Sequence, residues 1–223
     1  MSKVTTAQEI KKFMHDGMSI MVGGFGKPGQ PDTLIEAVLE TGVKDIHVIS
    51  NSSGVLTKDG VASGVALWVV HDMVKKISCS HIGGCPETGR RMIAGEIEVE
   101  LIPQGTFIER IRCGGMGLGA VLTPTGVGTP VEEGKEIKEI DGVKYLVEYP
   151  LHADVSLICG SIADKAGNVY YKGGTKNFNP AMASAGDLVI AEVDEIVELG
   201  EIDPSKVGTP GIMVDYIVKK EAK

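Results

Sequence analysis

The sequence predicts an α/β protein whose core is an open, mostly parallel, doubly wound sheet. Short apolar runs alternate with helical patterns along most of the chain, and strands that are joined by crossover helices of this length lie parallel. A hairpin pattern near residues 135–149 adds a small antiparallel excursion. Because no internal repeat or low-complexity linker interrupts the 223 residues, a single domain is expected over residues 1–223.

The first two helices are predicted from their ends. Thr6 and the glutamate three residues later have the spacing of a capping box, so a helix is expected over residues 7–15. Pro31 suits the first turn of a second helix, because the first turn needs no amide hydrogen there, and apolar residues recur at helical spacing over residues 33–39. The short apolar run Ser19–Val22 between the two helices is then a buried strand.

The middle of the chain continues this alternation. Residues 45–50 are predicted to form the second strand, because Gly42 provides a helix C-cap before them. The apolar run at residues 65–74, with Trp68 as a core residue, is interpreted as a buried helix, since residues 78–82 have the pattern of a third strand. Residues 83–88 join this strand to a helix that is expected to run to about residue 94, and a strand at 98–102 and a helix at 107–112 are expected next.

The last part of the chain begins with irregular segments. Four glycines within residues 113–119 predict a tight turn that packs backbone against backbone or against a partner chain, and residues 123–129 are expected to form a loop. Within residues 135–149, Asp141 and Gly142 separate two alternating segments, which predicts a hairpin. Further strands are expected at residues 155–159, 169–172, 188–193 and 212–218, with a short helix at 181–185.

Charge and hydropathy exclude several classes of partner. The formal net charge is −8 and no basic run exceeds two residues, which argues against nucleic acid and anionic membranes. The longest uncharged apolar runs, such as residues 60–70, are too short to span a membrane. The polar N-terminus has the pattern of a helix and not of a signal peptide, so a cytoplasmic location is expected.

The four cysteines show no metal-site or disulfide pattern. Cys79, His81 and Cys85 could supply three metal ligands, but no fourth ligand stands at a recognisable spacing. There is no Cys-x-x-Cys pair, and the surroundings are apolar or rich in glycine. Buried free thiols are therefore expected at all four positions, including Cys113 and Cys159, and no bound metal is predicted.

The most informative stretch is the glycine-rich segment that follows the first strand. Four glycines fall within the seven positions from Gly23 to Gly29, so the backbone can adopt positive φ and approach a ligand closely. The N-terminus of the helix that follows favours an anionic ligand. A β–α turn without a ligand is one alternative. A dinucleotide site is another, because Gly24-x-Gly26-x-x-Gly29 matches that fingerprint, although the next strand ends in Ser50 and not in the required acid.

This stretch resembles the signature of the first subunit of family I coenzyme A transferases. The fixed positions of the signature are filled by Asp16-Gly17, Ile20-Met21-Val22, Gly23-Gly24-Phe25, Gly29 and Pro31. The resemblance implies coenzyme A contacts at Gly23, Gly24, Phe25, Gly26, Lys27, Pro28 and Gly29. It continues in collinear order through residues 80–83, 86–91, 103–106, 109–112, 123–126, 164–168, 175–180 and 209–211. Among the branches of the family, including the 3-oxoacid CoA-transferases, the chain is most similar to the alpha (A) subunits of the acetate- and butyrate-acetoacetate branch.

The resemblance also implies a reaction and a partner. The family transfers coenzyme A by a ping-pong mechanism through a glutamyl-CoA thioester, and its nucleophile lies in a Ser-Glu-Asn-Gly-like segment of the second subunit. This chain has no such segment. A beta subunit is therefore implied, in a heterodimer or an A2B2 heterotetramer. Coenzyme A is then a substrate, no cofactor is expected, and the acyl donor is acetyl-, butyryl- or acetoacetyl-CoA, among which the sequence does not choose.

Gln104 is the candidate catalytic residue of this chain. It follows a predicted strand, where open α/β sheets place ligand groups, and its side-chain amide is a neutral donor that can stabilise an oxyanion. The resemblance links a glutamine in this Pro-Gln-Gly segment to the oxyanion hole. The alternative is a turn glutamine that bonds to nearby backbone.

Two other classes of function remain open. A sugar-phosphate isomerase has a similar sheet architecture, but it needs an acid–base pair and phosphate-binding lysines, for which the sequence shows no recognisable cluster. The chain could also serve as a non-catalytic acyl-CoA-binding subunit. Activity of the isolated chain on ribose phosphates, or assembly with a second chain without acyl-CoA turnover, would identify these alternatives.

Overall fold

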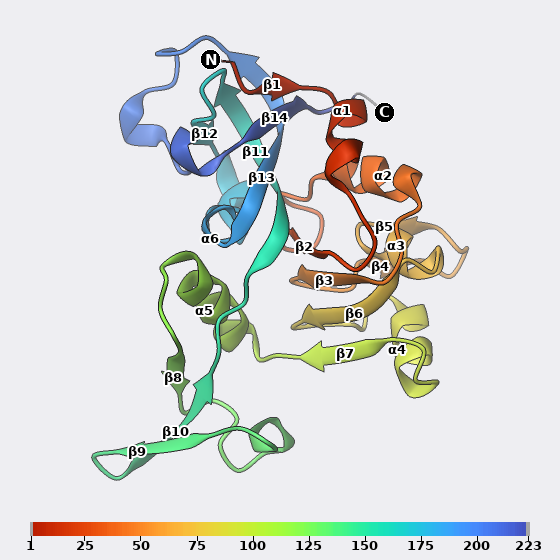
Figure 1. Ribbon diagram of the computed structural model, residues 1–223, viewed down its shortest axis with the longest axis vertical. Helices are drawn as coiled ribbons and strands as arrows, with labels where there is room; N and C mark the ends of the chain where they lie inside the picture. The colour runs from red at the N-terminus through yellow and green to blue at the C-terminus, as the bar shows by residue number, and fades with distance from the viewer. Residues whose placement is uncertain (1, 222–223) are drawn as a thin grey trace.

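Nine strands form one sheet in the computed structural model, which describes residues 2–221 (Figure 1). Eight of them follow the order β1-β14-β13-β11-β2-β3-β6-β7, in which every neighbouring pair is parallel, and β12 pairs antiparallel with β11. The predicted mostly parallel sheet is confirmed. Its strands are β1 (Val4–Thr5), β2 (Ser19–Val22), β3 (Ile46–Ser50), β6 (Val74–Cys79), β7 (Glu98–Leu101), β11 (Ala153–Asp164), β12 (Val169–Tyr170), β13 (Gly186–Val197) and β14 (Tyr216–Lys219).

Six α-helices and five short 3-10 turns lie within the described residues, and α1 continues directly into one of these turns. The helices are α1 (Ala7–Ile10), α2 (Asp32–Thr41), α3 (Ala66–Val70), α4 (Pro86–Ile93), α5 (Gln104–Gly115) and α6 (Asn179–Ser184). The 3-10 turns are η1 (Lys11–Phe13), η2 (Pro130–Glu132), η3 (Gly173–Lys176), η4 (Pro204–Lys206) and η5 (Gly211–Met213). The hydroxyl of Thr6 accepts a hydrogen bond from the amide of Glu9 at 3.2 Å, as the capping box predicts, and Gly42 ends α2 with φ +69°.

Helices cover both faces of the sheet, because alternate strand residues point in opposite directions. Ile20 and Val48 belong to a core on one face, together with α2 and α3, whereas Met21 and Ile49 belong to a core on the other face, with α5 and α6. Trp68 is fully buried in the first core, so it is a core residue as predicted. Its indole nitrogen donates to the backbone carbonyl of Ile35 in α2 at 2.9 Å. The doubly wound arrangement is thus present.

The order of the strands reverses next to β2. After β1, the chain builds one half of the sheet through β2, β3, β6 and β7. It then returns to β11 on the other side of β2 and continues through β13 to β14, which pairs with β1. The arrowheads of β3, β6 and β7 all point to the left in Figure 1, so the carboxyl ends of these strands share one side of the molecule. Open α/β sheets bind ligands outside the carboxyl ends of the strands, at the position where the strand order reverses.

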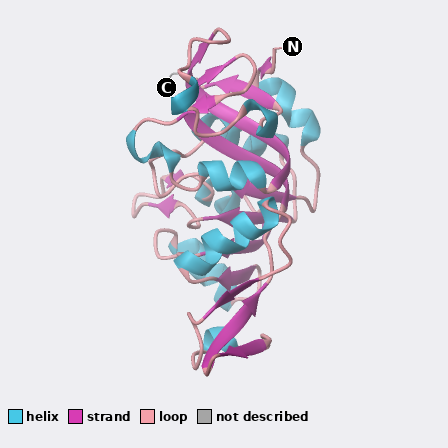
Figure 2. Cartoon of the chain, turned by 90° about the vertical axis from the view of Figure 1, so that its left-hand side faces the viewer, coloured by secondary structure: helices cyan, strands magenta, loops and turns pink. Residues whose placement is uncertain are grey.

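A three-stranded antiparallel sheet forms an arm at the lower end of the molecule (Figures 1 and 2). It contains β8 (Val121–Thr123), β9 (Ile137–Ile140) and β10 (Val143–Glu148), so the hairpin predicted at residues 135–149 is confirmed, while β8 was not predicted. Arg110 of α5 joins this arm to the main sheet. Its guanidinium donates to Glu100 of β7 at 2.7 Å and to the backbone carbonyl of Tyr149 at 2.6 Å.

The boundary between α3 and β6 differs from the prediction. α3 ends at Val70, and β6 begins at Val74, so both the helix predicted at residues 65–74 and the strand predicted at 78–82 are wrong in their limits. Asp72 adopts φ +59°, a left-handed conformation that ends the helix. The apolar residues after it are buried by pairing with β3, which sequence periodicity alone does not reveal.

α5 also differs, because it begins at Gln104, earlier than predicted, and continues through Gly115. The glycines at its end allow very close packing. A Cβ atom at Gly114 would lie 2.2 Å from the carbonyl oxygen of Leu151, and one at Gly115 would lie 2.0 Å from the hydroxyl of Ser184. The expected backbone packing at residues 113–119 is therefore present, but much of it occurs inside a helix and not in a turn.

Several other limits shift in the described residues. The first predicted helix is split between α1 and η1, and β14 is shorter than the predicted strand at 212–218, since η5 occupies its first part. The two-residue strands β1, β4 (Val55–Leu56) and β5 (Ala62–Ser63) were not predicted. Each exists only through its pairing partner, so its own sequence carries little signal.

All four cysteines are free and buried, as predicted. Among residues 2–221, no group of three or more His, Cys, Asp and Glu side chains is arranged to hold a metal ion. No helix in this part of the chain combines the length and the apolar character needed to cross a membrane.

Candidate functional site

Three polar side chains meet at the carboxyl ends of β3, β6 and β7. Asn51 follows β3, Ser80 follows β6, and Gln104 follows β7 as the first residue of α5. The side-chain nitrogen of Asn51 donates to the amide oxygen of Gln104 at 2.9 Å, and the hydroxyl of Ser80 lies within hydrogen-bonding distance of the same oxygen. The three side chains form one cluster because parallel strands end at the same edge of the sheet.

The contacts of Gln104 fix the direction of its amide. Because its oxygen faces the donor group of Asn51, its NH2 group must point away from the cluster. That NH2 group makes no hydrogen bond to any other described residue, and Gln104 is exposed to solvent. The NH2 group is thus an oriented donor at the surface. It stands at the N-terminus of a twelve-residue helix, whose partial positive charge favours a developing anion nearby.

The segment from Gly23 to Gly29, called the glycine loop below, follows the carboxyl end of β2 at the position where the strand order reverses. Gly24, Gly26 and Gly29 have φ of +110°, +61° and +72°, so the positive φ expected from the sequence is present. The amide of Phe25 donates to the carbonyl of Pro28 at 3.1 Å, which closes a tight turn. Glycine is favoured at these positions because residues with side chains rarely adopt such backbone angles.

Asn179 at the start of α6 holds this loop in place through buried hydrogen bonds. It is fully buried, and its side-chain nitrogen donates to the carbonyl of Gly29 at 3.1 Å and to that of Thr175 at 2.8 Å. Its oxygen accepts from the amide of Cys159 in β11 at 2.8 Å. A Cβ atom at Gly23 would lie only 1.9 Å from that oxygen, so the loop, β11 and α6 are locked together.

The outer side of the loop carries an aromatic ring and a cation. Phe25 is 53% exposed and its ring stacks on Phe178 with centroids 6.3 Å apart. The side chain of Lys27 is 70% exposed and pairs with Asp32 at 2.7 Å. Both groups remain accessible to a ligand that approaches the loop from solvent.

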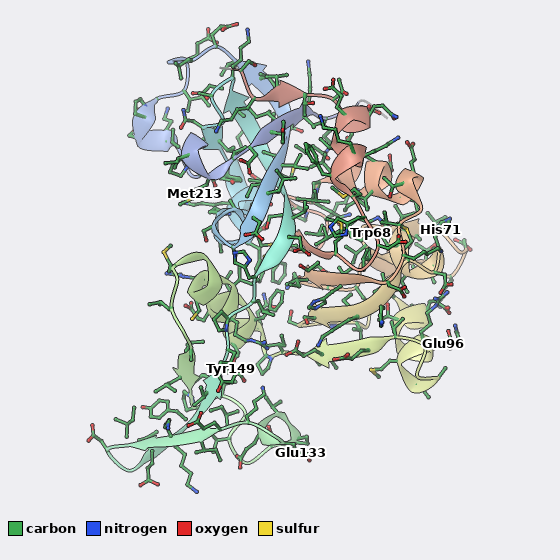
Figure 3. All side chains as sticks on the ribbon, viewed as in Figure 1. Trp68, His71, Glu96, Glu133, Tyr149 and Met213 are labelled. Atoms are coloured by element: carbon green, nitrogen blue, oxygen red, sulfur yellow. The ribbon has the colours of Figure 1, made fainter. Side chains whose placement is uncertain are left out.

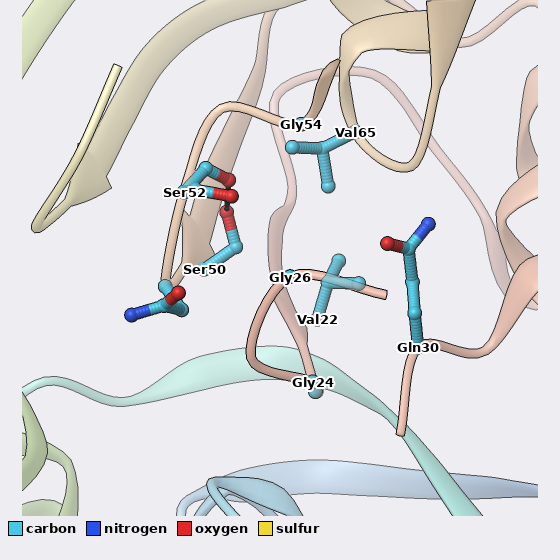
Figure 4. A pocket seen from close by; sticks show the side chains of 10 residues that line it. Val22, Gly24, Gly26, Gln30, Ser50, Ser52, Gly54 and Val65 are labelled. Carbon is cyan, nitrogen blue, oxygen red and sulfur yellow. Dashed lines mark hydrogen bonds between the residues drawn. The ribbon is translucent and has the colours of Figure 1, made fainter. Parts of the chain in front are cut away.

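A small cavity separates the glycine loop from the segment that follows β3 (Figure 4). Its volume is about 20 Å³, and ten residues line it. Its lining residues are Val22, Gly23, Gly24, Gly26, Gln30, Ser50, Asn51, Ser52, Gly54 and Val65. Asn51 belongs to both the cavity wall and the Gln104 cluster, so these two parts form one continuous site.

Two buried ionisable groups lie beneath this region. Burial raises the pKa of the Glu192 carboxyl to about 7, and one of its oxygens accepts from the amide of Leu34 in the first turn of α2 at 3.1 Å. Its other oxygen has no hydrogen-bond partner among the described residues, and the ammonium of Lys220 lies 4.0 Å away. Burial also raises the pKa of Cys159 to about 12, so this thiol is not a nucleophile at neutral pH.

Sequence reasoning identified the glycine loop and Gln104, and the structure places both at the carboxyl edge of the sheet. It missed the roles of Asn51, Ser80 and Asn179. A signal for Asn51 was present, because the polar run at residues 50–53 ends a buried strand, where ligand groups gather. No local signal identifies Asn179 as the anchor of a loop that lies about 150 residues before it in the sequence.

Comparisons with known proteins identify the family of the chain. The model of the family described as coenzyme A transferase matches residues 3–220. The acetate CoA-transferase subunit alpha of Escherichia coli K12 is 49% identical over 223 residues, which cover 100% of this chain and 99% of that protein. The acetoacetyl-CoA:acetate/butyrate CoA transferase alpha subunit of Clostridium acetobutylicum is 46% identical and covers 99% of each chain.

Solved structures share the fold. The acyl-CoA transferase YdiF of E. coli O157:H7, in a thioester complex with coenzyme A, superposes with a TM-score of 0.86 at 22% identity. The match covers 98% of this chain, which spans only 47% of the YdiF chain. Because the family model covers nearly the whole sequence and two full-length relatives exceed 45% identity, the chain belongs to the coenzyme A transferase family and is a transferase that acts on coenzyme A groups.

Proposed function

We propose that this chain is the alpha subunit of a coenzyme A transferase that exchanges coenzyme A between a short-chain acyl-CoA and a carboxylic acid. The acyl-CoA is acetyl-, butyryl- or acetoacetyl-CoA. Its partner is a beta subunit, in a heterodimer or an A2B2 heterotetramer in the cytoplasm. Coenzyme A is a substrate, and no further cofactor takes part. The relatives from E. coli and C. acetobutylicum, which bear the names of alpha subunits, support this assignment.

The reaction begins when a glutamate carboxylate of the beta subunit attacks the thioester carbonyl. This attack gives a mixed anhydride and releases coenzyme A as a thiolate. The thiolate then attacks the glutamyl carbonyl of the anhydride, which forms a glutamyl-CoA thioester and releases the first acid as a carboxylate. The acceptor acid reverses these steps and leaves with coenzyme A. Each attack produces an oxyanion that needs a hydrogen-bond donor.

The oriented amide of Gln104 is the observation that supports the proposal most strongly. Asn51 holds its oxygen, so its NH2 group faces solvent at the N-terminus of α5, where it can donate to an oxyanion. A glutamine that merely closed a turn would use its amide on nearby backbone. Gln104 makes no such bond among the described residues.

The nucleophile must come from elsewhere, because the glutamates that come closest to the expected motif are unsuitable. Glu133 lies on the arm (Figure 3). Glu132 precedes it in η2, and its carboxylate accepts from the amide of Gly128 at 2.6 Å. The carboxylate of Glu201 accepts from the amide of Glu198 at 2.8 Å. The ten residues that line the cavity include no acid. A carboxylate from a beta subunit would complete the site.

The glycine loop is proposed to bind coenzyme A with Gly23, Gly24, Phe25, Gly26, Lys27, Pro28 and Gly29. Its exposed ring and cation, Phe25 and Lys27, suit the uncharged pantetheine arm and the phosphates of the ligand. The global charge of −8 repels an anion, so local groups must supply the attraction.

The test is reconstitution. The purified chain alone is expected to be inactive, and the chain mixed with the beta subunit is expected to exchange coenzyme A between short acyl-CoAs and acetate or acetoacetate. Robust turnover by the chain alone would overturn the division of the active site. Activity on ribose phosphates would identify an isomerase, and a stable complex without acyl-CoA turnover would identify a non-catalytic binding subunit.

A further inference from the structure

The cavity beside the glycine loop is lined by two apolar side chains and by several polar ones. Val22 at the end of β2 and Val65 just before α3 are the only apolar side chains of its wall, and both are almost fully buried. Figure 4 shows Val65 and Val22 on opposite sides, with Gln30 at one edge and Ser50 and Ser52 at the other. A narrow gap between two valines, with polar groups around it, fits a short alkyl group that is attached to a polar carbonyl.

One polar residue of this wall also contacts the proposed oxyanion donor. Asn51 lines the cavity and donates to the oxygen of Gln104. A thioester whose oxygen lies near the NH2 group of Gln104 would therefore place its alkyl group on the cavity side of Asn51.

We propose that this cavity is the pocket for the acyl group and that Val65, with Val22 opposite it, sets the length of chain that the enzyme accepts. The inference rests on the proposed function and adds the choice of substrate that the sequence leaves open. A volume of about 20 Å³ holds one water-sized group. The pocket therefore accepts the methyl group of an acetyl unit in preference to the propyl group of a butyryl unit.

The backbone of the cavity wall is closely packed at Gly54. A Cβ atom at Gly54 would lie 2.4 Å from the amide nitrogen of Ala66 in the first turn of α3. Gly54 and the start of α3 are thus already in contact at this part of the wall. Truncation of Val65, just before α3, therefore enlarges the apolar part of the cavity without requiring the backbone to move.

The experiment measures kcat/KM of the reconstituted complex for acetyl-CoA and butyryl-CoA. Val65→Ala should lower the preference for acetyl-CoA by about tenfold or more, because one methylene in an apolar pocket changes selectivity by about 10- to 200-fold. Val69→Ala is the matched control, since Val69 is buried in α3, four residues after Val65, but does not line the cavity. A change below twofold with Val65→Ala in folded complex, or an equal change with Val69→Ala, would overturn the proposal.

A second measurement separates this inference from the proposed function. Methyl NMR signals of Val22 and Val65 should shift when acetyl-CoA binds to the complex and should shift much less with coenzyme A alone, whereas the Val69 methyls stay unchanged. This result would support the pocket even if the complex failed to transfer coenzyme A. Equal shifts with coenzyme A alone, or no shift with acetyl-CoA, would show that the acyl group does not enter the cavity.

Discussion

Asn51 and Gln104 are 53 residues apart in the sequence, yet the side-chain nitrogen of Asn51 donates to the amide oxygen of Gln104 at 2.9 Å. This single hydrogen bond decides which end of the Gln104 amide is available to a substrate. It connects the segment after β3, which lines the cavity, to the first turn of α5. A donor, a small pocket and a glycine loop thereby share one edge of the sheet.

Replacement of Gln104 separates a catalytic role from a structural one. Gln104→Ala should lower kcat of the reconstituted complex by roughly 10²–10³-fold, about 2.7–4 kcal/mol, because an oxyanion donor acts in the transition state. The KM for acyl-CoA should change little, since a thioester oxygen is a weaker acceptor than the oxyanion. Gln104→Glu should be at least as harmful, because it places one negative charge against another.

The measurement is kcat of complex whose size and melting temperature match the wild type. A fall smaller than about threefold would remove Gln104 from the oxyanion hole. Lost stability or lost assembly with a normal kcat in the remaining complex would indicate a structural glutamine.

Substitutions in the glycine loop distinguish a binding surface from a folding requirement. Gly24→Val should damage the loop, because Gly24 has φ +110° and its Cβ atom would lie 3.2 Å from the backbone of Gln30. Gly26 has φ +61° and open space around it, so Gly26→Asn should keep the fold and obstruct the ligand. The KM for acyl-CoA should rise by about tenfold, a loss of about 1.4 kcal/mol of binding.

Gly17→Asn provides the control, because Gly17 also has a positive φ and open surroundings but lies before β2, outside the loop. If folded Gly26→Asn complex keeps the wild-type KM for acyl-CoA, this loop does not contact the ligand.

Asn179 should contribute to stability through buried hydrogen bonds. Asn179→Ala leaves the amide of Cys159 and the carbonyl of Gly29 without their partner, and each buried unpaired group costs about 1–3 kcal/mol. The free energy of unfolding in urea should therefore fall by at least about 2 kcal/mol. Asn177→Ala is the control, since Asn177 also bonds to the loop, at the carbonyl of Pro28, but is exposed. Equal losses for the two variants would contradict the anchoring role of Asn179.

Glu192 should make the stability of the chain depend on pH. Burial raises its pKa in the folded state from 4.5 to about 7, so the folded state binds this proton more tightly than the unfolded state. The stabilising contribution of the bound proton is fully present below pH 4.5 and is lost as the pH rises towards 7, at about 1.4 kcal/mol for each pH unit.

Glu192→Gln removes this titration, so the variant should gain stability relative to the wild type between pH 4.5 and pH 7. The measurement is the free energy of unfolding in urea across that range. Glu195→Gln, an exposed position on the same strand, should leave the pH profile unchanged. Parallel pH profiles for the wild type and Glu192→Gln would refute the raised pKa.

The sequence by itself determined the features that depend on local chemistry. The apolar run of β2, the glycines that need positive φ, the C-cap at Gly42 and the hairpin turn at Asp141 and Gly142 all follow from the conformational preferences of a few adjacent residues. The alternation of strand and helix then required parallel pairing and gave the fold class. The absent Ser-Glu-Asn-Gly segment is likewise visible without a structure.

Only the tertiary structure decided which distant residues meet. The boundary between α3 and β6 depends on burial against β3, and the pairing of β1 with β14 joins the two ends of the chain. Asn51, Ser80 and Gln104 form one cluster because β3, β6 and β7 lie side by side and end together. Asn179 reaches the glycine loop because β11 returns next to β2. These contacts follow from the order of strands in the sheet, which is set by the packing of the whole chain and not by the preferences of neighbouring residues.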